Sequence, residues 1–189
     1  MSDPVLTFAN QAEWESWLEL NANATTGVWL RLAKKAAGQA TLTYAEAIES
    51  ALCHGWIDGQ KKAENEHYWL QRFTTRTARS LWSKINKAKA EALISAGRMH
   101  PAGIREIERA KQDGRWDAAY SSARTSTVPD DLQKALDANK KAKAFFATLD
   151  GSNRYAVLFR IHNVKKAETR ARKIARFVEM LANGEKLHP

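Results

Sequence analysis

The sequence predicts an α+β protein. An N-terminal module with a small sheet and flanking helices is followed by a basic, all-helical C-terminal module. Two uneven distributions along the 189-residue chain predict this division. All seven tryptophans lie between Trp14 and Trp116. Residues 128–189 hold 13 Lys+Arg and 7 Asp+Glu, so the last third of the chain carries six of its nine formal positive charges.

Both distributions change at the same place in the chain. Residues 121–127 read Ser-Ser-Ala-Arg-Thr-Ser-Thr, and Pro129 follows shortly after. Small polar residues before a proline are typical of a linker. The predicted organisation is therefore an α+β module over residues 1–120, a linker over 121–128 and a helical module over 129–189.

The first module opens with a short helix and a strand. Asn10 is followed three residues later by Glu13, a pattern that indicates a capped helix start, and Trp14 then faces inward. Residues 28–32 alternate between aliphatic and other side chains, which is the period of a half-buried strand.

A second helix and two further strands follow. Thr43 with Glu46 forms a stronger capping box, and Gly55 suits the left-handed position that ends a helix. Residues 56–59 indicate a short strand that enters a turn at its glycine. Residues 67–73 alternate again and predict a strand.

The remaining elements are all helices. Helical spacing runs over residues 83–97, and a second helix starts near Pro101 and ends near Gly114. The second module is predicted to contain four helices, over residues 130–137, 140–149, 152–162 and 167–183.

Composition excludes several classes of protein. Cys53 is the only cysteine, so no disulfide framework is expected. The first residues lack the basic and apolar segments of a signal peptide, and no apolar run approaches the roughly 20 residues of a membrane span. We therefore expect a cytoplasmic protein without a membrane span.

Seven stretches of the chain carry a family resemblance: residues 42–47, 51–59, 72–76, 80–86, 97–99, 128–132 and 166–174. Together they resemble the YdeI/OmpD-associated family, also called the bacteriocin-protection family. The resemblance implies a bacterial protein linked to stress or antimicrobial-peptide resistance, with an OmpD-associated-like helical module at residues 129–189. It implies no particular reaction, cofactor or catalytic residue.

The densest cluster of functional side chains lies in the first module. Arginine grips phosphate or carboxylate through two nitrogens, and tryptophan supplies an apolar floor, so such a cluster suits a small anionic ligand. The predicted ligand-binding residues are Trp56, Asp58, Arg72, Arg76, Trp82, Ser83, Lys84 and Asn86. The alternative is that Asp58 forms a structural ion pair with Arg72 or Arg76 and that the tryptophans are core.

No catalytic residue, metal site or cofactor is predicted. Cys53 and His54 are adjacent, but neighbouring helical residues point about 100° apart and do not face each other. Cys53 follows the inward-facing Leu52 and suits a small buried position. None of the five histidines has a second ligand at metal-binding spacing on the same short element.

The last predicted helix has one cationic face. The residues proposed to bind a partner are Arg170, Arg172, Lys173 and Arg176. At about 100° per residue, an apolar stripe lies opposite them. The stripe consists of Ala171, Ile174, Ala175, Val178 and Leu181, with Phe177 beside it. A nucleic acid, an anionic membrane surface or an acidic protein could use the cationic face, and the alternative is a solvated face without a partner.

Three functions therefore stay open. The first is a non-enzymatic stress or bacteriocin-protection protein that binds a small anionic ligand or a protein partner. The second is a nucleic-acid-binding protein that uses the basic C-terminal helix. The third is an enzyme whose site the fold assembles from distant residues.

Overall fold

A computed structural model describes residues 3–22, 24–25, 27–38 and 41–189. The chain divides into two compact units, residues 1–119 and residues 120–189. Each unit has its own cluster of buried apolar side chains. The first unit combines a sheet with helices and the second is helical, which confirms the predicted α+β class.

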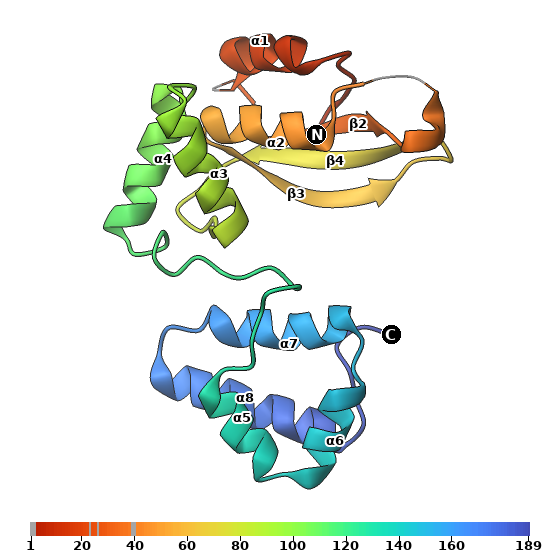
Figure 1. Ribbon diagram of the computed structural model, residues 1–189, viewed down its shortest axis with the longest axis vertical. Helices are drawn as coiled ribbons and strands as arrows, with labels where there is room; N and C mark the ends of the chain where they lie inside the picture. The colour runs from red at the N-terminus through yellow and green to blue at the C-terminus, as the bar shows by residue number, and fades with distance from the viewer. Residues whose placement is uncertain (1–2, 23, 26, 39–40) are drawn as a thin grey trace. The chain divides into compact units, whose positions relative to one another are not determined.

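In the part of the first unit that the structure describes, four strands form one sheet (Figure 1). They are β1 (Val5–Leu6), β2 (Gly27–Ala33), β3 (Trp56–Ala63) and β4 (Tyr68–Thr75). The spatial order is β1-β2-β4-β3, with β1 parallel to β2 and the other two pairs antiparallel. The sheet thus ends on β3 at one side and on the two-residue β1 at the other.

The described residues of the first unit also form four α-helices and a short 3-10 turn. They are α1 (Gln11–Asn21), η1 (Lys35–Ala37), α2 (Tyr44–Cys53), α3 (Lys84–Ser95) and α4 (Pro101–Gln112). Figure 1 shows α1 and α2 over one face of the sheet and α3 and α4 beside one end of it. The helix α2 is central, because it contacts α1, β3, α3 and α4.

The helix starts form as the sequence predicts. The Asn10 side chain accepts a hydrogen bond from the Glu13 amide at 3.0 Å. Thr43 and Glu46 form both bonds of a capping box at the start of α2. Gly55, which follows the last residues of α2, has a φ of 75°. A side chain at that position would be strained, so glycine both ends the helix and turns the chain into β3.

Trp14 is the centre of the first unit's core. Its side chain is completely buried and stacks on Trp17 with ring centroids 5.3 Å apart. Its ring also meets those of Trp56 at 6.4 Å and Phe73 at 5.9 Å. The indole nitrogen donates to the Ala47 carbonyl of α2 at 3.2 Å. One residue of α1 therefore contacts both the neighbouring helix and the sheet.

The predicted turn at Gly59 is wrong. The strand β3 continues past it, and its register against β4 shifts between Asp58 and Lys61. The side-chain amide of Gln71 on β4 donates to the carbonyls of Gly59 at 2.9 Å and Gln60 at 3.2 Å. A β-bulge accommodates one extra residue on β3, and the buried side chain of Gln71 satisfies the carbonyls that the bulge leaves unpaired.

Beyond the bulge, β3 is exposed. Lys61 and Lys62 both lie in this exposed half of the strand. The ammonium of Lys62 sits 4.6 Å from the centroid of the Trp29 ring on β2. A long basic side chain thus covers an aromatic ring on the sheet face opposite α1 and α2.

The second unit consists of α5 (Asp130–Asp137), α6 (Lys140–Thr148), α7 (Gly151–His162) and α8 (Ala167–Ala182). All four predicted helices are confirmed to within one residue at each end. The core takes side chains from every helix; the most buried are Leu132, Leu136, Ala142, Val157, Ile161 and Leu181. Among the helices described, none combines the length and apolar character needed to cross a membrane.

Candidate functional site

The structure brings three of the eight predicted ligand-binding residues together. The guanidinium of Arg76 lies 3.6 Å from the Trp82 ring centroid and donates to the Leu81 carbonyl at 3.2 Å. Ser83, the third of these residues, follows Trp82 in the sequence. Arg76 is 6% exposed and Trp82 is 2% exposed, and Trp82 packs edge-on against Trp116. This cation–π pair is therefore part of the core.

Asp58, Arg72 and Trp56 lie apart from that pair and have other partners. The Asp58 carboxylate accepts a 2.7 Å hydrogen bond from the Tyr44 hydroxyl. Arg72 pairs with Asp3 at 2.6 Å. Trp56 is buried in the Trp14 cluster. The ion pair that the sequence suggested between Asp58 and an arginine is replaced by these contacts.

The last three predicted residues mark the start of α3. The Ser83 hydroxyl accepts from the Asn86 amide at 3.0 Å, which caps the helix, and Lys84 is exposed. These contacts give most of the eight residues structural roles. The ligand-binding role that the sequence predicts for them stays a prediction.

Of the four predicted partner-binding residues, Arg170 is fixed within the second unit. Its guanidinium makes a bidentate pair with Asp131 at 2.6 and 3.0 Å and donates to the Ile161 carbonyl at 2.8 Å. The hydrogen bond from Arg170 holds the pKa of the Asp131 carboxyl below its ordinary value. Arg170 thus ties α8 to both α5 and α7.

This pair predicts a pH dependence of stability. Because the folded-state pKa of Asp131 is depressed, its contribution is present above the unfolded-state pKa near 4 and is lost as pH falls through the folded-state value. Asp131→Asn is expected to destabilise the second unit by about 1 kcal/mol or less, since the pair is partly exposed. Thermal unfolding followed by circular dichroism measures the difference between variant and wild type. That difference should shrink between about pH 6 and about pH 3.

The matched control is Asp130→Asn, which makes the same change on the preceding residue. Asp130 forms no ion pair with any residue that the structure describes. If the loss of stability in Asp131→Asn is unchanged at low pH, the stabilising role of the Asp131–Arg170 ion pair is contradicted. An equal loss in both variants would contradict it as well.

The other cations of α8 divide into two groups. Arg172 is exposed and only approaches Glu168, at 3.9 Å. Lys173 and Arg176 instead line a cavity of about 520 Å³, together with Arg160 from α7. Within the described ranges, none of these three cavity-lining cations forms an ion pair. The fold therefore gathers three positive groups around one hollow, which we call the α7–α8 cavity.

Apolar side chains and the end of the chain complete the α7–α8 cavity. Phe177, Met180 and Leu187 supply its apolar lining. The buried Asn153 holds the C-terminal segment in place, because its side chain exchanges two hydrogen bonds with the His188 backbone, at 2.8 and 3.2 Å. A cavity of this size, lined by both apolar and charged side chains, suits a small molecule.

Two carboxylates also reach the rim of this cavity. Glu179 and Glu185 lie among its lining residues. The three cations and two carboxylates of the lining together carry a net charge of +1. The arrangement thus favours a single anionic group over a densely charged polyanion.

The position of Phe177 corrects the predicted apolar stripe of α8. The sequence placed Phe177 beside the stripe, whereas the structure buries it with Ile174 and Leu181. Ala171 and Ala175, predicted to face inward, are exposed and line a groove of about 530 Å³ along α5 and α8. The Phe177 ring occupies the core because its burial removes more apolar surface from water than the burial of an alanine methyl group does.

Sequence reasoning missed Arg160. It lies near the end of α7, and its Nη1 donates to the Ala156 carbonyl one turn earlier at 3.1 Å. The only signal available was a basic residue in the last turn of a predicted helix, which is a common position for arginine. Its convergence with Lys173 and Arg176 depends on the packing of α7 against α8.

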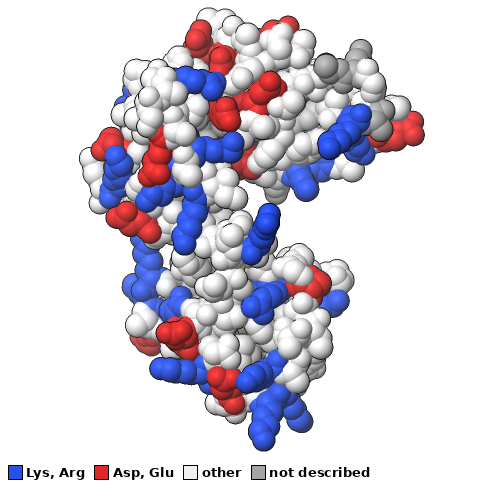
Figure 2. Space-filling view, viewed as in Figure 1, with Lys and Arg blue, Asp and Glu red and all other residues white. Residues whose placement is uncertain are grey.

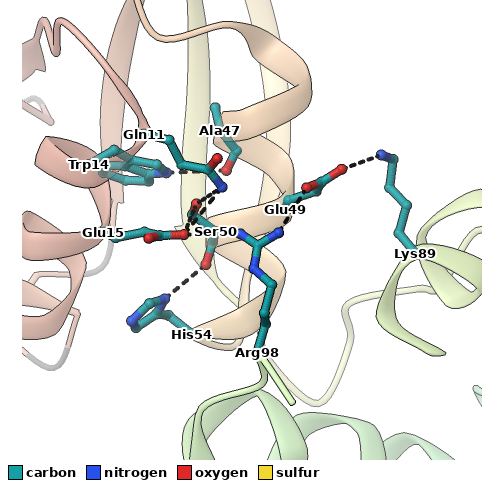
Figure 3. Close-up of polar contacts among 9 residues, drawn as sticks. All are labelled: Gln11, Trp14, Glu15, Ala47, Glu49, Ser50, His54, Lys89 and Arg98. Atoms are coloured by element: carbon teal, nitrogen blue, oxygen red, sulfur yellow. Dashed lines mark hydrogen bonds and ion pairs between the residues drawn. The ribbon is translucent and has the colours of Figure 1, made fainter. Parts of the chain in front are cut away.

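The first unit contains a half-buried polar network that the sequence also did not reveal (Figure 3). Ser50 of α2 donates to Glu15 of α1 at 2.7 Å and accepts from Gln11 at 2.9 Å. Arg98, from the segment between α3 and α4, pairs with Glu15 at 3.3 Å and with Glu49 at 3.4 Å. The network joins three segments that are far apart in the sequence, so no local spacing signals it.

The network adjoins Cys53 and His54. Cys53 is 2% exposed, and burial raises the pKa of its thiol to about 11, so the buried position expected for it is confirmed. A thiol with so high a pKa is a poor nucleophile at neutral pH. His54 is also buried, and desolvation lowers the pKa of its imidazole.

Comparison with known families follows the division into two units. Residues 6–106 match the family described as "Domain of unknown function (DUF8412)", and the chain belongs to this family. Residues 125–184 match the family described as "Bacteriocin-protection, YdeI or OmpD-Associated". The second match confirms, for the helical unit, the resemblance found in the sequence, and it includes all three cavity-lining cations. No curated protein and no solved structure matches the chain.

Proposed function

We propose that the protein is a non-enzymatic bacteriocin-protection protein that binds a small ligand in the α7–α8 cavity. The ligand carries one carboxylate or phosphate group on a partly apolar body. The observation that carries this proposal is the convergence of Arg160, Lys173 and Arg176, none of them ion-paired with another described residue, around one hollow. The family match over the same unit supports the class of function.

The side chains that line the cavity can bind both parts of the proposed ligand, its anionic group and its apolar body. Guanidinium groups bind carboxylate and phosphate through two parallel hydrogen bonds, and an ammonium adds a mobile charge. Phe177 and Met180 are the apolar side chains that α8 contributes to the lining of the same cavity. The lining could therefore contact both an anionic group and an apolar body.

The charge pattern argues against nucleic acid as the partner. Figure 2 shows acidic and basic side chains interspersed on the visible face of the helical unit. Non-specific binding to a phosphate backbone needs several cations in a row without intervening carboxylates. Glu179 and Glu185 at the rim interrupt such a row.

The binding test uses three probes that separate charge from apolar body. Phenyl phosphate carries both parts, inorganic phosphate only the charge, and benzyl alcohol only the body. We expect calorimetric titration to show the tightest binding for phenyl phosphate. Arg176→Glu should weaken it by about tenfold or more, because one charge-assisted hydrogen bond contributes about 1.5–3 kcal/mol.

The matched control is Arg172→Glu, which makes the same charge reversal one turn earlier on α8, outside the cavity. It should leave the affinity for phenyl phosphate within about twofold. Equal losses in both variants would show that only the overall charge matters. Binding of a DNA oligonucleotide that depends steeply on salt and on Arg172 would favour the nucleic-acid function instead.

A growth assay tests protection itself. Bacteria that express the full chain are expected to survive a bacteriocin at concentrations that kill cells carrying the empty vector. Arg176→Glu should lose this protection and Arg172→Glu should keep it, at equal expression. Survival that is the same with wild type and empty vector would contradict the proposal.

A further inference from the structure

Three potential metal ligands meet in the first unit. One ring nitrogen each from His54 and His100 and a carboxylate oxygen of Glu19 all lie within 4.8 Å of one another. The two imidazoles are stacked with centroids 4.0 Å apart. Two histidines and a carboxylate form a set of nitrogen and oxygen ligands that zinc commonly takes in proteins.

Helix packing sets the position of Glu19 opposite His54. Glu15 and Ser50 join α1 to α2 through their 2.7 Å hydrogen bond. Glu19 lies four residues after Glu15, and His54 lies four residues after Ser50, so each is one helical turn further along the same face. The polar network in Figure 3 therefore aligns this second pair as well.

His100 reaches the same point from another segment. Its backbone amide donates to the Cys53 carbonyl at 3.2 Å, which holds the start of α4 against the end of α2. Pro101 follows as the first residue of α4. Three separate parts of the chain thus each present one ligand.

The tautomer of His54 leaves a lone pair for a metal. Its Nδ1 lies 2.8 Å from the Ser50 carbonyl oxygen, and because a carbonyl only accepts, Nδ1 carries the hydrogen. The neutral ring then has its lone pair on Nε2. That atom is buried and has no hydrogen-bond partner among the residues that the structure describes. A carbonyl that orients a histidine through its other nitrogen is the usual support of a metal-bound imidazole.

We propose that Glu19, His54 and His100 bind one Zn²⁺ ion. Around a tetrahedral zinc with ligand distances near 2.1 Å, neighbouring ligand atoms are about 3.4 Å apart, so the ligand atoms, which lie within 4.8 Å of one another, need to approach by at most about 1.4 Å. Glu19 is exposed and His100 is half-buried, so both side chains have room to adjust while His54 stays fixed. The exposed side of Glu19 leaves the fourth position to water.

The test measures zinc bound to the full, untagged chain after chelator treatment. Competition with a chromogenic chelator gives the affinity, and atomic emission gives the stoichiometry. We expect one Zn²⁺ per chain. Glu19→Gln and His100→Gln, which leave the buried His54 untouched, should each weaken binding by at least about tenfold.

Glu66→Gln and His67→Gln are the matched controls, because they make the same changes on an exposed pair of the same unit. Both should bind zinc like wild type, and circular dichroism confirms that all four variants fold. Absence of zinc binding in the wild type would overturn the proposal. So would an affinity that Glu19→Gln and His100→Gln leave unchanged, or that the control variants lower equally.

Discussion

Replacing Trp14 by alanine is expected to lower the free energy of unfolding of the first unit by about 3–5 kcal/mol. The side chain is completely buried and, among the described residues, lies against the four aromatic rings of Phe8, Trp17, Trp56 and Phe73, so its removal opens a cavity that the neighbouring rings cannot fill. The bond from its indole nitrogen to Ala47 is lost as well. Urea denaturation, followed by the fluorescence of the remaining tryptophans, measures the effect, because all of them lie in this unit.

Leu20→Ala is the control for this experiment. Leu20 lies on the same helix, but its side chain is 83% exposed. Its truncation should change the free energy of unfolding by no more than about 0.5 kcal/mol. Similar losses in the two variants would mean that α1 does not pack on the sheet through Trp14.

Replacing Gly103 by alanine is expected to destabilise the first unit by about 3 kcal/mol, the upper end of the usual range for overpacking. A Cβ atom at this position would lie 2.7 Å from the Leu52 carbonyl oxygen and closer still to that of Cys53. Both are backbone atoms at the end of α2, so they cannot rotate away. Either α4 moves outward or the end of α2 distorts. The same urea experiment measures the loss.

Gly151→Ala provides the comparison for Gly103→Ala. Gly151 is also the glycine of a helix, but a Cβ atom there would meet nothing within 4 Å. Alanine should be neutral or slightly stabilising at this position, because it has the better helix propensity. Urea denaturation of this variant is followed by far-ultraviolet circular dichroism, because the second unit contains no tryptophan. A Gly103→Ala variant as stable as wild type would show that α4 does not pack closely on α2.

Local signals in the sequence predicted the helices well. The capping box of Thr43 and Glu46 and the four helices of the second unit depend on residues within a few positions of each other. The bulge near Gly59 was not predictable in this way, because its carbonyls are satisfied by Gln71 from a neighbouring strand. Without that partner, a glycine after a short strand indicates a turn.

The candidate sites show the same limit. The amphipathic pattern of α8 indicated Lys173 and Arg176 but contained no information on Arg160, whose position depends on how α7 packs. Arg170 belongs to the same cationic face in the sequence pattern, but in the structure it forms an ion pair with Asp131. Glu19, His54 and His100 come from three segments, so their meeting depends on tertiary packing alone.

The exposed half of β3 has a consequence for how the protein behaves at high concentration. This strand is one edge of the sheet, and an edge strand offers free backbone groups to any other strand. Here the bulge interrupts the regular spacing of those groups, and Lys61 and Lys62 place positive charge beside them. A second copy that approached edge to edge would meet an irregular backbone and like charges. The features that make β3 an imperfect strand thus discourage this chain from aggregating through its sheet.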